Sequence, residues 1–228
     1  MPEDRFRAER ESILVLAKKM CEAGLVVASA GNVSARVRDP LARAIAITPT
    51  SIPYDVMTPD QVVVVSIESG ATIESTFRAS CELPTHLAIY RHRQDVDAIV
   101  HTHSPYVSTL SALRKPLPPI IDEMVVYFGG TVEVADYAFT GTDELGANVV
   151  RALGDRAGAL LSNHGNVCVG RDLAEALHVA LTMESTARVY VEALRTGGAV
   201  PLPEESLRLG RAMYDRRRDS QRGAVPNR

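Results

Sequence analysis

A short apolar run, Val96–Val100, ends in two histidines, His101 and His103, and Ser104-Pro105 follows at once. Residues i and i+2 of a β-strand point to the same face, so a strand here would carry both imidazoles on one side of its carboxyl end. Ser104 as N-cap and Pro105 at the first helical position predict that a helix begins directly after it. Two neutral imidazoles this close together stabilise a fold little unless they share a proton or a metal ion. The segment therefore predicts a strand, a helix and a metal site between them.

Composition limits the class of protein. The chain has 228 residues, enough for one domain with a well-buried core, and its 46% hydrophobic and 23% charged residues are typical of soluble globular proteins. No apolar run is long enough to span a membrane, and the N-terminus is polar rather than signal-like. Cys21, Cys81 and Cys168 have no metal-type spacing and predict reduced thiols in the cytoplasm. The formal net charge of −3 argues against a general nucleic-acid binder, so an anionic substrate needs a local binding site.

The pattern of apolar residues predicts both helices and strands. Helices are expected over residues 5–21, 81–92, 105–113, 143–153, 173–195 and 204–214. Short apolar runs between turn residues predict strands over 25–28, 44–47, 62–67, 96–103, 120–126, 131–135, 159–162 and 167–169. Together they predict a single α/β domain, residues 1–214, whose helices surround a mainly antiparallel sheet. Residues 215–228 are rich in arginine and poor in core residues, which predicts a flexible C-terminal tail.

A third histidine, His164, lies in a turn after a predicted strand. Three neutral imidazoles with one open position are the usual arrangement of a catalytic zinc ion, so His101, His103 and His164 are candidate ligands. Such an ion acts as a Lewis acid, and a nearby carboxylate can serve as general base. Glu82, in the first turn of a predicted helix, is the candidate base, although a carboxylate there can also merely cap the helix. His86, one turn further along the same face, is expected to give an orienting hydrogen bond.

Three turns of small residues precede these histidines and suggest a binding site for an anion. Glycine lets the backbone approach a ligand closely, while Ser and Thr hydroxyls and helix N–H groups donate to phosphate oxygens. The turns are Ala30-Gly31-Asn32, Thr48-Pro49-Thr50-Ser51 and Ser80-Cys81. Together with a metal site they predict a phosphorylated or otherwise anionic small substrate.

The motifs have a recognisable order along the chain: Ala-Gly-Asn-Val-Ser at 30–34, Thr-Pro-Thr-Ser at 48–51, Ser-Cys-Glu at 80–82, His-Thr-His-Ser-Pro at 101–105 and Asn-His-Gly at 163–165. In this order they resemble the class II aldolase/adducin-head family over about residues 7–195. The resemblance implies an α/β/α fold with a mainly antiparallel central sheet. It also implies a homotetramer with active sites between subunits.

The resemblance further implies a role for each motif. It implies Zn2+ held by His101, His103 and His164, with Glu82 at the position of the catalytic acid/base. The family's phosphate-binding positions fall on Gly31, Asn32, Thr50, Ser51, Ser80 and Cys81. The implied reaction is the reversible cleavage of a ketose 1-phosphate, of the fuculose-1-phosphate type, to dihydroxyacetone phosphate and an aldehyde.

The chain departs from the family pattern at several places that concern the substrate. Cys81 stands where a serine is usual, so a thiol replaces one phosphate-binding hydroxyl. Glu123 stands at the position of a catalytic tyrosine, and we expect it to act as an acid at the aldehyde end of the site. Tyr214 aligns loosely with a C-terminal tyrosine that closes the site.

Other members of this family suggest alternative functions. Pentulose-phosphate epimerases usually carry Asp at the position of Glu82, which disfavours that branch. Sugar-phosphate dehydratases and keto-acid decarboxylases share the metal triad and remain alternatives. An adducin-like interaction module without metal is disfavoured because all three histidines are present. A non-haem iron oxygenase would need two histidines and one carboxylate as ligands, so three histidines together with the phosphate-type turns disfavour it.

Overall fold

The protein is built around one mixed sheet. The computed structural model describes residues 5–39 and 42–219. Within them eight strands form one sheet in the order β4-β3-β2-β1-β5-β8-β7-β6, in which β6 and β7 are parallel and all other neighbours antiparallel. The strands are β1 (Asn32–Arg36), β2 (Ala44–Ile47), β3 (Val63–Ser66), β4 (Thr72–Glu74), β5 (Ala98–Thr102), β6 (Val134–Ala135), β7 (Gly158–Leu161) and β8 (Gly165–Gly170). The predicted mainly antiparallel sheet is confirmed.

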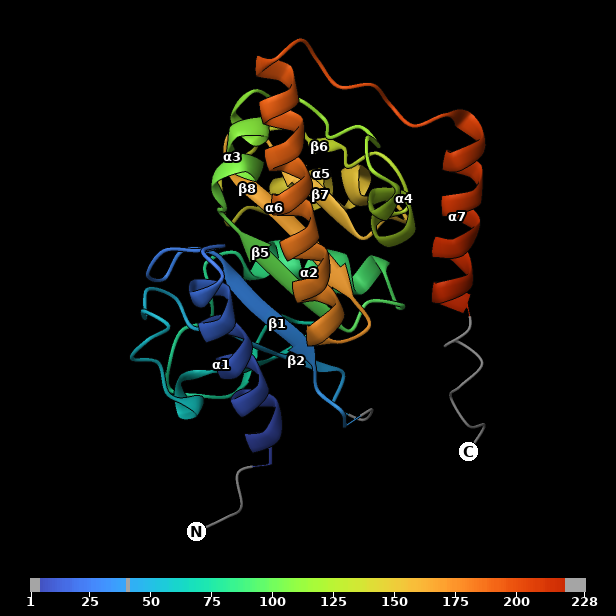
Figure 1. Ribbon diagram of the computed structural model, residues 1–228. Helices are drawn as coiled ribbons and strands as arrows, with labels where there is room; N and C mark the ends of the chain where they lie inside the picture. Colours follow the sequence, from blue (N-terminus) through green and yellow to red (C-terminus); the bar gives the residue numbers. More distant parts are fainter. Residues whose placement is uncertain (1–4, 40–41, 220–228) are drawn as a thin grey trace.

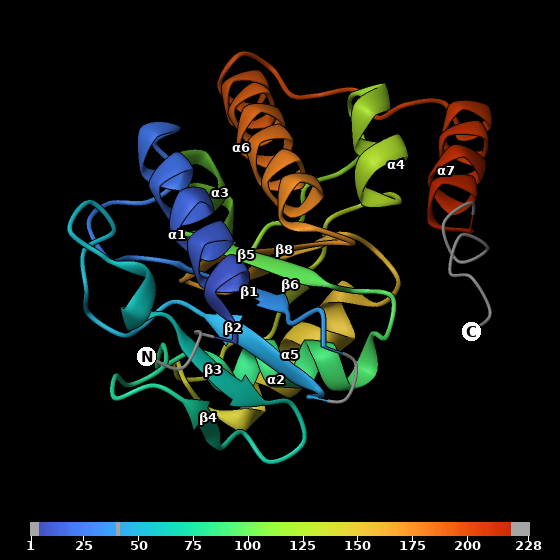
Figure 2. The ribbon, with the colours of Figure 1, turned by 90° about the horizontal axis from the view of Figure 1, so that it is seen from below.

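Helices cover both faces of this sheet. They are α1 (Arg7–Glu22), α2 (Leu83–His92), α3 (Pro105–Ala112), α4 (Asp122–Phe128), α5 (Asp143–Leu153), α6 (Leu173–Arg195) and α7 (Glu204–Asp219), with a short 3-10 helix at Pro59–Gln61. In Figure 2, α1, α3 and α6 lie on one side of the sheet and α2 and α5 on the other, while Figure 1 shows α6 crossing the front of it. This confirms the expected α/β/α layers. No helix in the residues described is both long and apolar enough to cross a membrane.

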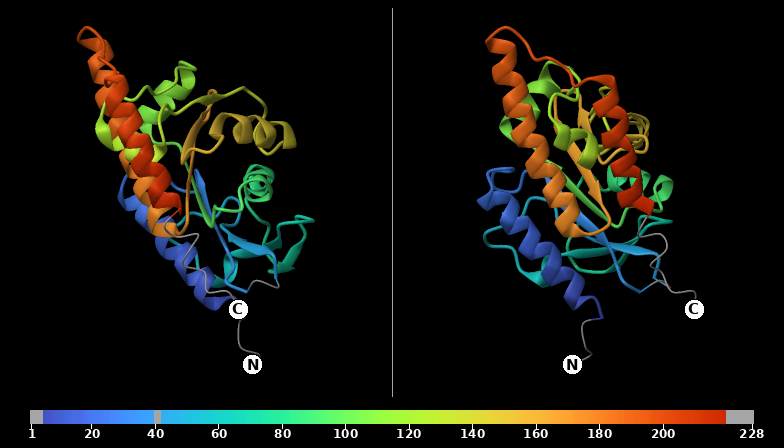
Figure 3. Two further views of the ribbon diagram at one scale, coloured as in Figure 1. Left: turned by 90° about the vertical axis from the view of Figure 1, so that its right-hand side faces the viewer. Right: turned by 45° about the vertical axis from the view of Figure 1, so that its right-hand side comes forward.

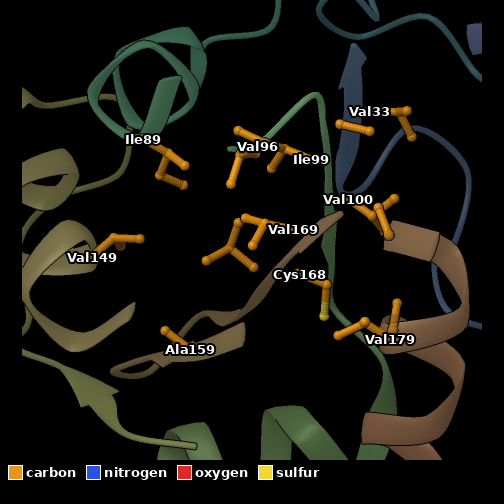
Figure 4. Packing of buried hydrophobic residues seen from close by; sticks show 14 of the residues in the cluster. Val33, Ile89, Val96, Ile99, Val100, Val149, Ala159, Cys168, Val169 and Val179 are labelled. Atoms are coloured by element: carbon orange, nitrogen blue, oxygen red, sulfur yellow. The ribbon is translucent and has the colours of Figure 1, made fainter. Parts of the chain in front are cut away.

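The central strands are buried on both faces, and their side chains alternate between the two helical layers. Ile99 of β5 pairs with Val169 of β8, and both lie on the side of α2 and α5 (Figure 4). The next pair, Val100 and Cys168, lies on the side of α6. Because residues two apart on a strand share a face, His101 leaves the sheet on the side covered by α2.

The C-terminal helix extends beyond its predicted end. Residues 215–219, assigned from the sequence to a flexible tail, form the last turn of α7, and residues 220–228 lie outside the part described. Two arginines of this turn form ion pairs with the rest of the protein: Arg217 lies 3.3 Å from Glu175 in α6, and Arg218 lies 2.6 Å from Asp95. In the right-hand view of Figure 3, α7 stands apart from α6 at the end of an extended connection.

The strand predicted over residues 25–28 is absent. Leu25 and Val26 are buried but belong to a loop, and Ala28 has a φ of +56°, which interrupts extended backbone. The strand in this region is β1, whose sequence Asn-Val-Ser-Ala-Arg is not a continuous apolar run. Its polar positions face α2, where they take part in the site described below.

The strand predicted over residues 120–126 is also wrong, because this segment forms helix α4. Asp122 and Glu123 occupy its first turn, where negative charge favours a helix N-terminus. Gly129 ends it in the left-handed conformation, with φ +86°. Its buried residues Met124, Val125 and Phe128 have helical spacing, which the apolar character of the segment concealed.

Candidate metal centre and active site

Three histidines and one glutamate meet at the carboxyl end of β5. The ligand atoms of Glu82, His101, His103 and His164 all lie within 4.8 Å of one another. Nε2 of His101 is 2.8 Å from Nε2 of His103 and 2.9 Å from Oε2 of Glu82. Nε2 of His164 is 3.2 Å from Oε1 of Glu82. The structure therefore brings the three predicted metal ligands and the predicted acid/base together.

Backbone geometry places these side chains. His101 is the last residue but one of β5 and His103 lies directly after the strand, so both are on the face covered by α2. His164 lies in the turn between β7 and β8. The next residue, Gly165, leaves no room for a side chain: a Cβ there would lie 2.2 Å from the carbonyl oxygen of Thr102 and 2.9 Å from Cδ2 of His103. Glycine is thus required for the turn to bring His164 this close to β5.

The helix after the His-x-His segment begins where predicted, but another residue caps it. Ser104 is at the N-cap position, yet its hydroxyl donates to Oε2 of Glu184 in α6 at 2.7 Å. The Glu184 carboxylate accepts the backbone N–H groups of Tyr106 and Val107 at 3.0 and 2.9 Å. A carboxylate at this position satisfies the free N–H groups and the helix dipole. The point at which the chain turns away from β5 is therefore fixed by α6.

Hydrogen bonding and burial prepare the imidazoles for metal ligation. Nδ1 of His101 donates to the backbone carbonyl of Asn166 at 2.8 Å, so its Nε2 is directed toward the cluster as the potential ligand atom. Burial, together with the charge of His101, lowers the pKa of His103 to about 3 and that of His164 to about 4. Both are therefore neutral at pH 7, the form that binds a metal ion.

Glu82 is a buried, ionised carboxylate with a hydrogen-bond donor on each oxygen. Burial alone would raise its pKa, but the charge and hydrogen bond of His101, with further contributions from His164 and Thr140, hold it well below the usual range. The pKa of His101 is raised. Burial alone would lower it, but the charge and hydrogen bond of Glu82 outweigh that effect. Nδ2 of Asn32 donates to Oε2 of Glu82 at 2.6 Å, and the hydroxyl of Thr140 donates to Oε1 at 2.9 Å.

The predicted phosphate-binding residues share one pocket with this cluster. Two of them follow β2, two precede α2, and two lie at the start of β1. The pocket has a volume of about 250 Å³ and is lined by Gly31, Asn32, Thr50, Ser51, Ser80 and Cys81, together with Glu82, His103 and His164. Hydroxyl, thiol and amide groups thus lie next to the imidazoles, as a substrate with a phosphate and a reacting carbonyl would require.

Gly31 allows the turn before β1 to pass close to β5. Its φ is +73°, and a Cβ on it would lie 2.5 Å from the carbonyl oxygen of His101. Any side chain would therefore push against the segment that carries two of the histidines. The carbonyl of Gly31 accepts the hydroxyl of Tyr54 at 2.6 Å, which holds the turn in place.

Several residues that make contacts around Glu82 were not predicted from the sequence. Thr140 comes from the loop before α5, and nothing in its local sequence indicates the contact. Ser34 and Tyr90 bond to each other at 2.9 Å, and Ser34 bonds to His86 at 2.6 Å. His86 in turn bonds to Asn32, as expected of an orienting residue, and burial followed by the charge of His101 lowers its pKa to about 3. The sequence signal for these contacts is spacing. Ser34 lies two residues from Asn32, as on one face of a strand, and Tyr90 lies four residues from His86, as on one face of a helix.

Two residues singled out from the sequence lie away from this pocket. Glu123 is exposed in the first turn of α4 and does not line it. Tyr214 is buried in α7, where its hydroxyl donates to the carbonyl of Asp155 at 2.8 Å and its ring packs against Gly129. Within the single chain described, neither residue lines the pocket that holds the metal cluster.

A larger cavity of about 380 Å³ lies beside α7, near the start of β5. Its charged groups pair with one another: Arg93 lies 2.8 Å from Asp95, and Arg171 lies 2.7 Å from Glu175. None of the metal-cluster residues lines it. The smaller pocket is therefore the candidate active site.

The fold and this cluster agree with a known family. Residues 11–191 match the family described as Class II Aldolase and Adducin N-terminal domain. The chain belongs to this family, as its motifs predicted.

Individual relatives are similar over most of their length. The chain is 34% identical over 202 residues to a 5-deoxy-D-ribulose 1-phosphate aldolase of Bacillus thuringiensis serovar kurstaki, covering 89% of this chain and 93% of the relative. It is 34% identical over 184 residues to the L-fuculose phosphate aldolase of Escherichia coli K12, covering 81% and 83%. A solved structure of L-fuculose 1-phosphate aldolase superposes with a TM-score of 0.86 at 33% identity, covering 91% of this chain and 96% of the other. These relationships define the chain as a metal-dependent aldehyde-lyase.

The donor set fits the metal that this class of enzyme requires. Three imidazole nitrogens converge with one carboxylate, and two of the imidazoles are held neutral by their surroundings. His101 uses its other nitrogen for a backbone carbonyl, as metal-ligating histidines commonly do. His101, His103 and His164 are therefore suited to hold a divalent ion, with Glu82 adjacent to it.

Proposed function

We propose that the protein reversibly cleaves a ketose 1-phosphate to dihydroxyacetone phosphate and an aldehyde. The observation that carries this proposal is the shared pocket, in which the residues at the family's phosphate positions lie beside three histidines and an ionised glutamate. The two curated relatives, each named as an aldolase of a sugar phosphate, support the same reaction type.

The substrate we favour is of the fuculose-1-phosphate type, on the strength of the motifs and of the structural similarity to L-fuculose 1-phosphate aldolase. A 5-deoxyribulose 1-phosphate is the second candidate, because the Bacillus relative that acts on it matches 89% of this chain. Both sugars offer the same phosphate and carbonyl to the pocket. They differ in the part that leaves as the aldehyde.

Zinc is the metal we propose, since three neutral imidazoles with an open position are typical of catalytic zinc sites. Held by His101, His103 and His164, it would supply Lewis-acid polarisation of the substrate carbonyl. The protein around it binds and orients the substrate: Thr50 and Ser80 provide hydroxyl groups for the phosphate. Asn32 uses one amide N–H for Glu82 and has a second for the substrate.

Glu82 is the proposed acid/base at the carbon between the carbonyl and the broken bond. Cleavage of the C3–C4 bond needs loss of the C4 hydroxyl proton and leaves the electron pair at C3. Glu82, ionised at rest, takes up a proton equivalent to the one lost from the C4 hydroxyl and delivers it to C3, which completes dihydroxyacetone phosphate. In the reverse direction the ionised carboxylate removes that proton, and the low pKa of Glu82 keeps it in this form.

Glu123 is proposed to act at the aldehyde end of the site of a neighbouring subunit. It is exposed on α4 and outside the pocket of its own chain, so it needs an assembly to reach one. A homotetramer with active sites between subunits, which the family resemblance implies, would provide this. The cytoplasmic location inferred from the three unpaired cysteines stays a prediction.

One assay tests the proposed function. Purified protein is incubated with fuculose, rhamnulose, ribulose, 5-deoxyribulose and methylthioribulose 1-phosphates, with and without a chelator, and release of dihydroxyacetone phosphate is followed. Release that the chelator abolishes and added zinc restores supports the proposal, and the preferred sugar identifies the aldehyde. A zinc-loaded protein that releases none from any of these compounds refutes it.

A further inference from the structure

A row of polar side chains connects α2 with the strand beneath it. Asn32 and Ser34 lie two residues apart on β1 and face α2, where His86 and Tyr90 lie four residues apart. Two residues of strand advance about 6.6 Å and four residues of helix about 6 Å, so the two spacings match. Side chains on the strand can therefore meet side chains on the helix in regular alternation.

The contacts form one continuous chain that ends at Glu82. Tyr90 bonds to Ser34 at 2.9 Å, and Ser34 bonds to Nδ1 of His86 at 2.6 Å. Nε2 of His86 bonds to Oδ1 of Asn32, whose Nδ2 donates to Glu82 at 2.6 Å. None of the first four residues is more than 2% exposed. Their polar groups must therefore satisfy one another.

The contacts leave the hydrogens in this chain only one direction. Oε2 of Glu82 accepts from Nδ2 of Asn32, which turns Oδ1 of Asn32 toward His86. That carbonyl oxygen also only accepts, so Nε2 of His86 must carry a proton. Neutral His86 then accepts at Nδ1 from the Ser34 hydroxyl, which accepts in turn from Tyr90. Every buried donor in the chain points toward Glu82.

The alternative tautomer of His86 would disturb the acid/base. With its proton on Nδ1, the bare Nε2 would face Oδ1 of Asn32, and two acceptors would repel each other. Rotation of the amide would relieve this contact but would direct Oδ1 at the Glu82 carboxylate. Either way the Asn32 donor to Oε2 of Glu82 would be displaced, and the carboxylate would keep only His101 near Oε2 and Thr140 and His164 near Oε1.

We propose that His86 is a positioning residue for the reaction: its Nε2–H tautomer, set by Ser34 and Tyr90, orients the Asn32 amide and thereby holds Glu82. In this role His86, Ser34 and Tyr90 act through Asn32 and Glu82 and are not ligands of the metal. The kinetic consequences rest on the proposed function, whereas the tautomer is a property of the folded protein alone.

The kinetic test compares three variants of α2. His86→Leu leaves the Asn32 carbonyl without a donor and is expected to lower kcat about 10–100-fold, as for other residues that orient catalytic groups. His86→Gln offers an amide N–H at a similar distance along the side chain and should recover most of that loss. Ile89→Val shortens a fully buried side chain of the same helix outside the polar chain, so it controls for lost packing.

The comparison distinguishes positioning from structural support. Rates are expressed per folded chain, with bound zinc measured for each variant. Equal losses in His86→Leu and His86→Gln, or an Ile89→Val loss as large as that of His86→Leu, would overturn the proposal.

The second measurement does not depend on turnover. A long-range ¹H–¹⁵N spectrum of ¹⁵N-histidine-labelled protein shows which ring nitrogen carries the proton, and the His86 signals are those missing in His86→Gln. The proton is expected on Nε2, with Nδ1 bare. A proton on Nδ1 alone overturns the proposal whatever the enzyme does. A protein with the Nε2–H tautomer and no aldolase activity would instead refute the proposed function and leave the tautomer assignment standing.

Discussion

Replacing Glu82 by glutamine removes the charge of the proposed acid/base while keeping its shape. In the wild-type protein Asn32 donates to one carboxylate oxygen at 2.6 Å and Thr140 to the other at 2.9 Å. A glutamine can keep its oxygen toward Asn32, and its amide nitrogen then faces Thr140, whose hydroxyl can rotate to accept. Both hydrogen bonds survive in Glu82→Gln, one of them reversed in direction.

The expected effects on stability and on turnover differ in size. A hydrogen bond to a charged group contributes roughly 1.5–3 kcal/mol and one between neutral groups roughly 0.5–1.5 kcal/mol, so weakening two of them lowers the free energy of unfolding by about 2–3 kcal/mol at most. Removing a buried charge offsets part of that loss. Loss of a general acid/base lowers kcat by about 10²–10⁴-fold, equivalent to about 3–5 kcal/mol in the barrier. Turnover should therefore fall much further than stability.

The assay measures dihydroxyacetone phosphate release at saturating substrate, with zinc per chain by elemental analysis and stability by urea unfolding. Glu82→Gln should retain its zinc because the three imidazoles are unchanged. A variant with full zinc occupancy and a kcat within tenfold of the wild type would show that Glu82 is not the acid/base.

The remaining predictions concern the metal, the phosphate end and the assembly. His103→Ala should lose bound zinc and activity together; normal zinc content would remove His103 from the ligand set. Gly165→Ala places a methyl group 2.2 Å from the Thr102 carbonyl oxygen, and urea unfolding should show a loss of about 1–3 kcal/mol or more; unchanged stability would refute the close packing of this turn. Cys81→Ser should lower KM up to about tenfold with little change in kcat, because a hydroxyl donates better than a thiol; a raised KM would exclude a phosphate contact. Glu82→Gln and Glu123→Gln chains are refolded together in equal amounts. If each site takes Glu82 from one chain and Glu123 from its neighbour, about one quarter of the sites have both glutamates and the mixture should recover about one quarter of wild-type activity. No recovery would show that both residues of a site come from one chain.

The fold was predictable where local pattern and tertiary structure agree. β5, the helix after it and the caps Thr142 and Asp172 follow from strand burial, proline at a helix start and side-chain oxygen atoms that accept helix N–H groups. α4 was mistaken for a strand because its apolar residues are consecutive as well as helically spaced. β1 was missed because its inward side chains are polar, and their partners lie on α2, some 50 residues further along.

The metal cluster was predictable because two of its histidines share one strand end and the third lies in a turn, directly before a glycine. Thr140 could not be found in this way, since only tertiary structure brings its loop to Glu82. The role of Asn32 changes for a similar reason. Its motif predicts a phosphate contact, while the structure adds hydrogen bonds to Glu82 and His86 that a linear sequence does not reveal.

One chain brings the candidate metal ligands, Glu82 and the proposed phosphate-binding positions together, but not the residue proposed for the aldehyde end. His103, His164, Glu82 and the proposed phosphate-binding positions line a single pocket, and the groups that we propose they bind are common to all ketose 1-phosphates. The residue proposed for the aldehyde end lies at the surface, because Glu123 is exposed in the first turn of α4. In the homotetramer proposed above, such a residue would acquire a defined environment at a contact between subunits. We therefore expect the choice of aldehyde to depend on the contact between subunits, and the reaction type on the pocket within each one.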